Sequence, residues 1–268
     1  MKLLKLTALF LGLFLLGILV PLQSFGVSLK RDLFALKIYH LQTKEQVERL
    51  NKYLQLAYLP ALHRAGIAKV GVFMQNEITD ASATAPTEQL IFVFIPCSSA
   101  EQYTKLNLGL DTDQIYHTAA QDYLNTAFDN PIYTRIETVL MLAFAGMPTY
   151  HLPALTSVPL ERVYELRSYE GATEKLHQNK VDQFNNAEIG IFKRLNFNTV
   201  FCGQVVAGSK MPNLMYLSTF ANQQEQTAHW QAFKDDAEWM KLSAMPEYAH
   251  NLLRMDKYML HPTAYSEI

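Results

Sequence analysis

Cysteine is scarce in this 268-residue sequence, which contains only Cys97 and Cys202. The two residues are far apart and form no CxxC pair, so neither a zinc site nor a framework of disulfides is indicated. Both lie in or beside segments expected to form strands, where a buried free thiol is an ordinary role for cysteine. The sequence therefore predicts no metal site and no structural disulfide.

An excess of charge of one sign is also lacking. The formal net charge is −2, with acidic and basic residues interspersed. There is no basic stripe of the kind that binds nucleic acid and no acidic tail of the kind that stays disordered. Nucleic acid is therefore not an expected partner.

Familiar catalytic motifs are absent as well. The sequence contains no GxSxG, HExxH, Walker or GxGxxG pattern. His177 and His229 lie on expected helices, but neither has a second candidate ligand three or four residues further on, so metal or haem ligation is not indicated. No cofactor and no catalytic residue is predicted, and enzymatic activity stays an open question.

The long hydrophobic run of this chain lies at its beginning. Lys2 and Lys5 precede an apolar run from Leu6 to Val20, and Ser24-Phe25-Gly26 follows Pro21. This order is typical of a secretory signal peptide, and 15 residues are short for a membrane-spanning helix. We expect residues 1–26 to be a cleaved signal peptide, and the protein to be exported to the periplasm or the exterior. A retained segment that anchors the protein to a membrane is the alternative.

The remaining sequence follows one order of elements twice. Strict alternation in Ala35–Tyr39 and Val163–Tyr169 is typical of strands, and Thr43 and Ser98 each begin a capping box that starts a helix. Each half has the order βαββαβ. Strands are expected over residues 33–40, 67–75, 89–95 and 132–144, then 162–169, 198–207, 213–220 and 252–260. Helices are expected over 43–66, 98–127 and 174–195 and from residue 222, and a long hairpin loop over 76–88.

Matching residues support an internal duplication. Lys37 matches Arg167, and Tyr39 matches Tyr169, both at an offset of 130. A βαββαβ unit forms a four-stranded antiparallel sheet with both helices on one face, the ferredoxin-like arrangement. Two such units can cover each other's open faces. We therefore expect an α+β fold in which two tandem ferredoxin-like units, residues 30–145 and 161–268, are joined by a linker at 146–160 and pack sheet to sheet as an α/β barrel.

Charged residues recur on the first and last strands of each unit. We expect the more apolar face of each sheet, which includes Leu36 and Leu166, to be covered by the helices. The charged face of each sheet would then be turned toward the other sheet. We expect Lys37 to pair with Glu137, and Arg167 with Asp256, across neighbouring strands. Because charges are rarely buried without partners, this face indicates either a cavity that binds a small molecule or a structural network at the barrel mouth. The candidate ligand-binding residues are Glu165, Arg167, Tyr169, Lys37, Tyr39, Glu137 and Asp256.

Several stretches of the second half resemble the NIPSNAP family. They are residues 163–169, 191–195, 211–216, 228–233, 242–248 and 261–266, which together cover most of residues 161–268. The first half is similar to the family mainly through its order of elements. The resemblance implies a dimeric α/β-barrel fold and no established reaction. Mitochondrial members of the family are linked to mitochondrial quality control and vesicle traffic. This chain begins with an expected export signal rather than a mitochondrial one, so these roles are not expected for it.

Two classes of function follow from these observations. One is a small-molecule site in the barrel, in a binding protein or in a cofactor-light enzyme of the monooxygenase-like or haem-handling kind found on this fold. The other is a non-enzymatic envelope protein that binds a protein partner through exposed helices or strand edges. A homo-oligomer is compatible with either class. Contact with a membrane is expected only through the N-terminal segment, if that segment is retained.

Overall fold

Eight strands form one closed antiparallel barrel in this computed structural model, which describes residues 30–75 and 88–268. The expected signal peptide, and the hairpin loop up to residue 87, lie outside the described residues. The strand order around the barrel is β1-β3-β2-β8-β5-β7-β6-β4. The strands are β1 (Leu33–Leu41), β2 (Gly71–Gln75), β3 (Gln89–Cys97), β4 (Arg135–Ala143), β5 (Val163–Glu170), β6 (Asn198–Ala207), β7 (Asn213–Phe220) and β8 (Arg254–Pro262).

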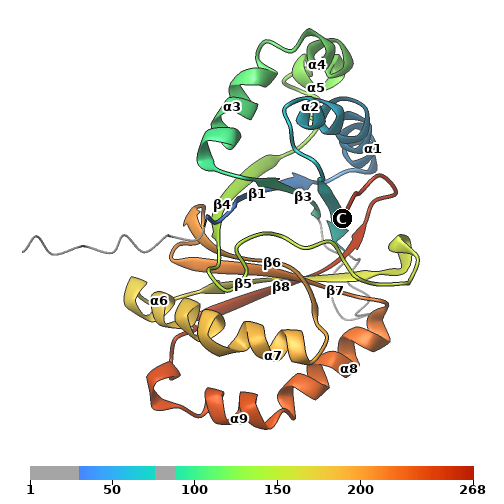
Figure 1. Cartoon of the computed structure of the whole chain (residues 1–268). Helices are drawn as coiled ribbons and strands as arrows, with labels where there is room; N and C mark the ends of the chain where they lie inside the picture. The colour runs from blue at the N-terminus through green and yellow to red at the C-terminus, as the bar shows by residue number, and fades with distance from the viewer. Residues whose placement is uncertain (1–29, 76–87) are drawn as a thin grey trace, which may run out of the picture.

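Helices cover the barrel on two opposite sides (Figure 1). Those of the first half, α1 to α5, lie on one side, and α6 to α9 of the second half lie on the other. The α-helices are α1 (Lys44–Tyr53), α2 (Leu59–Arg64), α3 (Ala100–Leu110), α4 (Gln114–Ala119), α5 (Gln121–Leu124), α6 (Glu174–Gln183), α7 (Ile189–Arg194), α8 (Gln223–Lys234) and α9 (Ala237–Ser243). A π-helical turn joins α1 to α2 at Leu54–Tyr58, and another joins α6 to α7 at Phe184–Glu188. Single 3-10 turns occupy Pro159–Glu161 and Pro246–Tyr248.

The two halves of the chain share the barrel equally. Strands of the first half lie in the order β4-β1-β3-β2, and those of the second half in the order β8-β5-β7-β6. The ring is closed where β2 pairs with β8 and β4 pairs with β6. The predicted α+β content and the predicted barrel of antiparallel strands are therefore confirmed.

Polar caps start the helices largely where the sequence predicts. The Thr43 side chain accepts a hydrogen bond from the Gln46 backbone, as expected of a capping box. The second capping box was placed one residue too early. Ser99 rather than Ser98 is the N-cap, because its side chain accepts from the backbone of Gln102, whose own side chain accepts from the Ser98 backbone.

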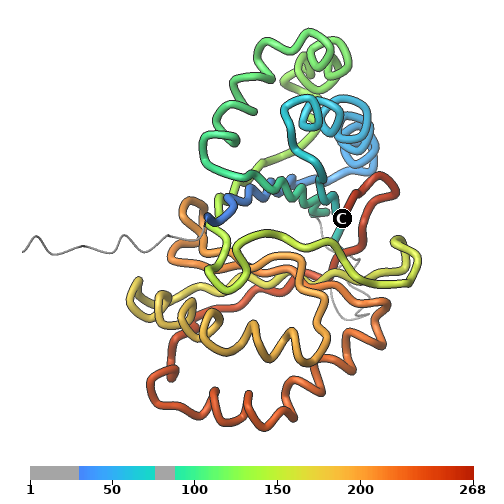
Figure 2. Tube along the Cα trace, in the orientation of Figure 1, coloured from blue at the N-terminus to red at the C-terminus, as the bar shows by residue number. Residues whose placement is uncertain are grey.

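The C-terminal segment crosses from the second half to the first (Figure 2). The Thr263 backbone donates to Val72, and the Glu267 backbone donates to Val70. The Glu267 side chain in turn accepts from the Val70 backbone at 2.8 Å. These bonds engage the backbone of β2 at Val72 and of Val70 just before it. Strand β2 begins at Gly71 rather than at the predicted Ile67.

The interior of the barrel is filled by aromatic and aliphatic side chains. Phe34, Phe94 and Phe201 are fully buried there, together with Phe92 and Tyr164. The rings of Phe94 and Phe201 stack with centroids 4.5 Å apart, and Phe34 lies 5.3 Å from Phe94. Because Phe94 belongs to β3 and Phe201 to β6, this stack joins the two halves of the chain.

Both cysteines are free and buried, as expected for this chain. No helix within residues 30–75 and 88–268 combines the length and the apolar character that crossing a membrane requires.

Replacing Phe94 with alanine tests the packing between the halves. We expect Phe94→Ala to lower the free energy of unfolding by about 3–5 kcal/mol, because the cavity left in a closed barrel cannot collapse. Urea unfolding followed by circular dichroism measures this change. Phe128→Ala is the matched control, since the Phe128 side chain is fully exposed, and its effect should stay within about 0.5 kcal/mol. Equal effects of the two substitutions would contradict the interior stack.

Candidate functional site

The predicted assignment of the two strand faces is wrong. Leu36 and Leu166, expected to face helices, point into the barrel core, whereas Tyr39 and Tyr169 pack with the helix-side clusters. An eight-stranded barrel has an interior just wide enough for side chains. That space is enclosed on every side, so the more apolar residues of each strand occupy it. Lys37, Glu165 and Arg167 lie on the helix side instead, whereas Glu137 and Asp256 lie on the other face, near an end of the barrel.

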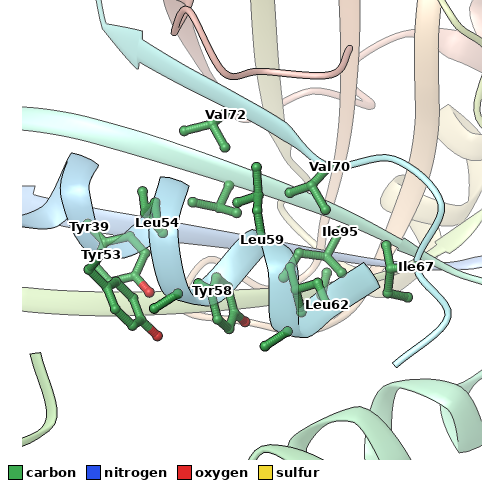
Figure 3. Packing of buried hydrophobic residues seen from close by; sticks show 14 of the residues in the cluster. Tyr39, Tyr53, Leu54, Tyr58, Leu59, Leu62, Ile67, Val70, Val72 and Ile95 are labelled. Carbon is green, nitrogen blue, oxygen red and sulfur yellow. The ribbon is translucent and has the colours of Figure 1, made fainter. Parts of the chain in front are cut away.

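The first-half candidates Lys37 and Tyr39 therefore do not line the barrel. Tyr39 lies beneath the first helical segment, close to Tyr53 and Tyr58 (Figure 3). The Lys37 ammonium lies 5.2 Å from the centroid of the Tyr58 ring. No carboxylate forms an ion pair with Lys37 among the residues that the structure describes, and burial lowers the pKa of this amine.

The predicted pair of Lys37 with Glu137 is absent, because the two side chains lie on opposite faces. The register sets Lys37 opposite Thr138 and Ile38 opposite Glu137, and a shift of one residue reverses the face. Glu137 instead accepts from Ser209 at 2.6 Å and lies 2.9 Å from His40. Hydrogen bonds from Ser209 and His40 help to hold the pKa of Glu137 below its ordinary value, against the opposing effect of burial.

The predicted pair of Arg167 with Asp256 is also wrong. Asp256 lies opposite Ser168 in the register, and its partner is Lys210 at 2.5 Å. Asp256 and Lys210 are both more than a third exposed. The small cavity beside this end of the barrel has a volume of about 40 Å³, which suits a water molecule rather than an organic ligand.

Glu165, Arg167 and Tyr169 do lie together, beneath α8. The Glu165 side chain is fully buried and accepts three hydrogen bonds. Its Oε1 accepts from Arg167 Nε at 2.6 Å, and its Oε2 accepts from Gln226 at 2.5 Å and Trp230 at 2.6 Å. The Glu165 carboxylate thus links Arg167, on the same strand, to Gln226 and Trp230, which lie one helical turn apart on α8.

The Arg167 guanidinium is held on several sides. Its carbon lies 3.6 Å from the centroid of the Trp230 ring, a cation–π contact. Its Nη1 donates to the Tyr169 hydroxyl at 3.2 Å, and that hydroxyl lies 2.8 Å from the hydroxyl of Tyr216. Burial acts to lower the pKa of Arg167, but Tyr216, Tyr169 and Glu165 together raise it. Burial also raises the pKa of both tyrosines, so they stay protonated.

A second buried ion pair lies beside the first. Lys180 on α6 donates to Glu188 at 3.0 Å and to Gln183 at 2.9 Å. Glu188 belongs to the π-helical turn, a form that is frequent at functional sites. Burial raises the pKa of Glu188, and the Lys180 charge opposes that rise. The Lys180 ammonium also lies 5.0 to 5.8 Å from the rings of Phe184, Trp239 and Tyr169.

These two networks form the floor of a groove of about 440 Å³. Four of its lining residues are basic, one is acidic and four are aromatic. Lys234 and Lys257, at its rim, are exposed and form no ion pair within the described part of the chain. The lining residues are Arg167, Tyr169, Lys180, Glu188, Gln226, Thr227, Trp230, Gln231, Phe233, Lys234, Trp239, Leu252 and Lys257. The groove can accept a small molecule from solvent, with positive charge exceeding negative charge around it.

Sequence reasoning missed several of these residues. Lys180 and Glu188 interrupt the buried stripe of the 174–194 helical segment, which includes Val181 and Phe184. Charged residues on an apolar stripe eight positions apart are a signal that could have found them. No pattern in the sequence showed that Trp230 and Trp239 would border a groove.

No three histidine, cysteine or acidic side chains gather as a metal site in the ranges that the structure describes.

The sequence profile of the NIPSNAP family matches the part of the chain that forms this groove, from residue 164 to residue 267. Residues 164–267 are a NIPSNAP domain. The resemblance seen in the sequence is thereby confirmed for the second half. The profile begins on β5 and includes Arg167, Tyr169, Trp230 and Lys257, so the groove belongs to the NIPSNAP domain. A search of curated protein sequences finds no match.

Two solved structures share the fold of most of the chain, including the part outside the NIPSNAP domain. A protein of Fusobacterium nucleatum named as a proposed monooxygenase has 4% identity and a TM-score of 0.55, with 87% of this chain and 93% of that chain covered. Another proposed monooxygenase, from Lactobacillus acidophilus, has 10% identity and a TM-score of 0.51, with 89% and 98% covered. A NIPSNAP family protein of Agrobacterium tumefaciens has 14% identity and a TM-score of 0.36, with 40% and 98% covered.

The carboxylate of Glu165 should matter more to stability than that of Asp256. We expect Glu165→Gln to lower the free energy of unfolding by about 3 kcal/mol, because it leaves the buried Arg167 charge without its partner. Asp256→Asn, which breaks an exposed pair, should cost less than about 1 kcal/mol. Urea unfolding of both variants measures the difference. A loss for Asp256→Asn as large as that for Glu165→Gln would refute this account.

Because Lys37 is buried without an acidic partner among the described residues, we expect the stability of the protein to depend on pH. Because burial lowers the Lys37 pKa from its ordinary 10.5, the unfolded state binds more protons than the folded state as pH approaches 10.5. The destabilising effect of Lys37 is therefore full at neutral pH and declines as pH rises. Lys37→Met should raise the free energy of unfolding on the order of 1 kcal/mol at neutral pH, and this gain should shrink near pH 10.

Urea unfolding of the wild type and Lys37→Met at both pH values provides the measurement. Lys175→Met is the control, because Lys175 is exposed and its replacement should change stability little at either pH. A gain for Lys37→Met that does not depend on pH would show that the Lys37 charge is not the cause.

Proposed function

We propose that the groove of the NIPSNAP domain binds a small molecule that has one anionic group and an apolar body. The observation that carries this proposal is the free edge of Arg167. Its Nε and Nη1 have partners in Glu165, Tyr169 and Met255, while its Nη2 has no hydrogen-bond partner among the described residues. A guanidinium edge that is oriented on three sides and vacant on the fourth is suited to a carboxylate or phosphate oxygen.

Charge around the groove supports an anion. The Lys180 and Glu188 charges neutralise each other, and Glu165 balances Arg167. Lys234 and Lys257 then add two positive charges at the rim that no described acidic residue pairs with. A surplus of this kind raises the local concentration of anions and speeds their association.

Size and aromatic content support an organic ligand rather than a bare ion. The groove volume of about 440 Å³ falls in the range of small-molecule sites, roughly 300–1,000 Å³. Trp230, Phe233 and Trp239 offer flat apolar surface beside the free edge of Arg167. A planar or aromatic body would bury its surface against these rings.

Further expectations complete this proposal. The shared strand order, and π-helical turns at positions 130 residues apart in the two halves, support a duplication of one ferredoxin-like unit.

We keep export as the proposed location, from the signal peptide expected in residues 1–26. The names of the two fold relatives make oxygenation of the bound molecule an alternative to simple binding, and a protein-binding envelope role is the other alternative.

Binding of 8-anilinonaphthalene-1-sulfonate, an anionic aromatic probe, tests the proposal. The two tryptophans of the chain, Trp230 and Trp239, both line the groove, so energy transfer from tryptophan reports that the probe is bound, and substitutions at the groove rim locate it. The double variant Lys234→Glu and Lys257→Glu should weaken probe binding by about tenfold or more, because it reverses two charges at the rim.

A matched double variant provides the control. Lys175→Glu with Lys241→Glu makes the same change in net charge, and both residues are exposed and outside the groove lining. This variant should bind the probe about as well as the wild type. Absence of energy transfer in the wild type, or equal weakening in the two double variants, would overturn the proposal.

A further inference from the structure

The hydroxyl groups of Tyr169 and Tyr216 have a defined donor and acceptor. The Tyr216 side chain is buried, and its hydroxyl oxygen lies 2.8 Å from that of Tyr169, its one hydrogen-bond partner among the described residues. A buried hydroxyl hydrogen without an acceptor is costly. The Tyr216 hydroxyl therefore donates, and the Tyr169 oxygen accepts.

The oxygen of Tyr169 accepts a second hydrogen bond, from Arg167 Nη1 at 3.2 Å. A phenol oxygen has room for two such bonds at most. The hydrogen of the Tyr169 hydroxyl then has no acceptor among the described residues, and Tyr169 lines the groove. Tyr169 is thus a donor whose hydrogen is available to a ligand.

The acceptors of Glu165 and Gln226 already have donors, and Glu188, the acidic residue of the groove lining, is paired with Lys180. Both oxygens of Glu165 accept hydrogen bonds from Arg167, Gln226 and Trp230. The Gln226 side-chain oxygen accepts from Gln223 and from Thr227. Beside Arg167, the floor of the groove therefore offers donors, which are the Nη2 hydrogens of Arg167 and the hydroxyl hydrogen of Tyr169.

We infer that the ligand of this groove is a carboxylate with a planar apolar body, and that Tyr169 is the residue that selects it over the corresponding amide. One carboxylate oxygen accepts from Arg167 Nη2, and the other accepts from the Tyr169 hydroxyl. The apolar body lies along Trp230 and Trp239. A primary amide of the same shape would direct its NH₂ group at one of these donors and leave it unsatisfied. This inference rests on the proposed binding function.

The burial of both tyrosines supports this selection. Burial raises the pKa of Tyr169 and of Tyr216, so each phenol keeps the hydrogen that the arrangement requires. Arg167 stays charged while the two phenols keep their hydrogens, because the pKa of Arg167 is also raised. The donors are therefore fixed before a ligand arrives, which reduces the entropic cost of binding.

The test compares 1-naphthoate with 1-naphthamide, which differ in the acid group and share the ring system. Isothermal titration calorimetry should give the wild type at least about 100-fold preference for the naphthoate. Tyr169→Phe should weaken naphthoate binding by about tenfold and leave naphthamide binding unchanged, so that the preference falls. Tyr216→Phe removes the other hydroxyl of the same pair and should retain the wild-type preference within about threefold.

The outcomes separate this inference from the function on which it rests. Equal binding of the two probes by the wild type overturns the inference, while the groove remains a binding site. Equal weakening of both probes in Tyr169→Phe also overturns it, because that result would indicate altered packing. If neither 1-naphthoate nor 8-anilinonaphthalene-1-sulfonate binds the wild type, the proposed function fails as well. Urea unfolding of both tyrosine variants confirms that the comparison is made on folded protein.

Discussion

Closure of the barrel is the constraint from which the other features of the structure follow. In an open sheet one face can meet water, whereas in a closed ring of eight strands the inner face meets only other side chains. Phenylalanine residues such as Phe34, Phe94 and Phe201 fill that interior. The alternate residues of each strand must then lie outside the ring, where the helices cover them. Buried charged side chains such as Glu165 and Arg167 therefore lie between the strands and the helices rather than at the centre of the barrel.

The two halves use this layer in different ways. At the position of Arg167 the first half has Lys37, which lies near Tyr58 and has no acidic partner among the described residues. In the second half, Glu165 supplies the missing charge and also binds two residues of α8. The same place in the two halves is therefore an apolar, tyrosine-rich core in one and a charged groove in the other.

Much of the fold follows from local pattern, and the site follows from it only in part. The expected bounds of β6 and β7 match those observed, Thr43 caps a helix as predicted, and the helix expected from residue 222 is α8, which Asn222 caps. Strand alternation shows which residues share a face, but it does not show which face is turned inward. On β5, tyrosine occurs on both faces, at Tyr164 and Tyr169, so hydrophobicity alone gave the wrong direction.

The grouping of Glu165, Arg167 and Tyr169 was nevertheless predictable, because residues at alternate positions of one strand must lie side by side. Their partners were not. Gln226 and Trp230 come from a helix some sixty residues later, and Lys180 and Glu188 come from another. The contact of these segments depends on how the helices pack, which no local pattern determines. The Asp256 prediction failed for a simpler reason, since the pairing register differs by one residue from that required.

The pairing of β2 with β8 has a consequence for how the chain reaches this structure. The strand that closes the ring, β8, follows all the other described strands in the chain, so during synthesis the ring cannot close until residues 254–262 have left the ribosome. Contacts between residues so distant in sequence form slowly. Until β8 arrives, the edges of β2 and β5 expose unpaired backbone groups that can join strands of other molecules. A form of the protein that ends before β8 would leave both of these edges without a partner strand.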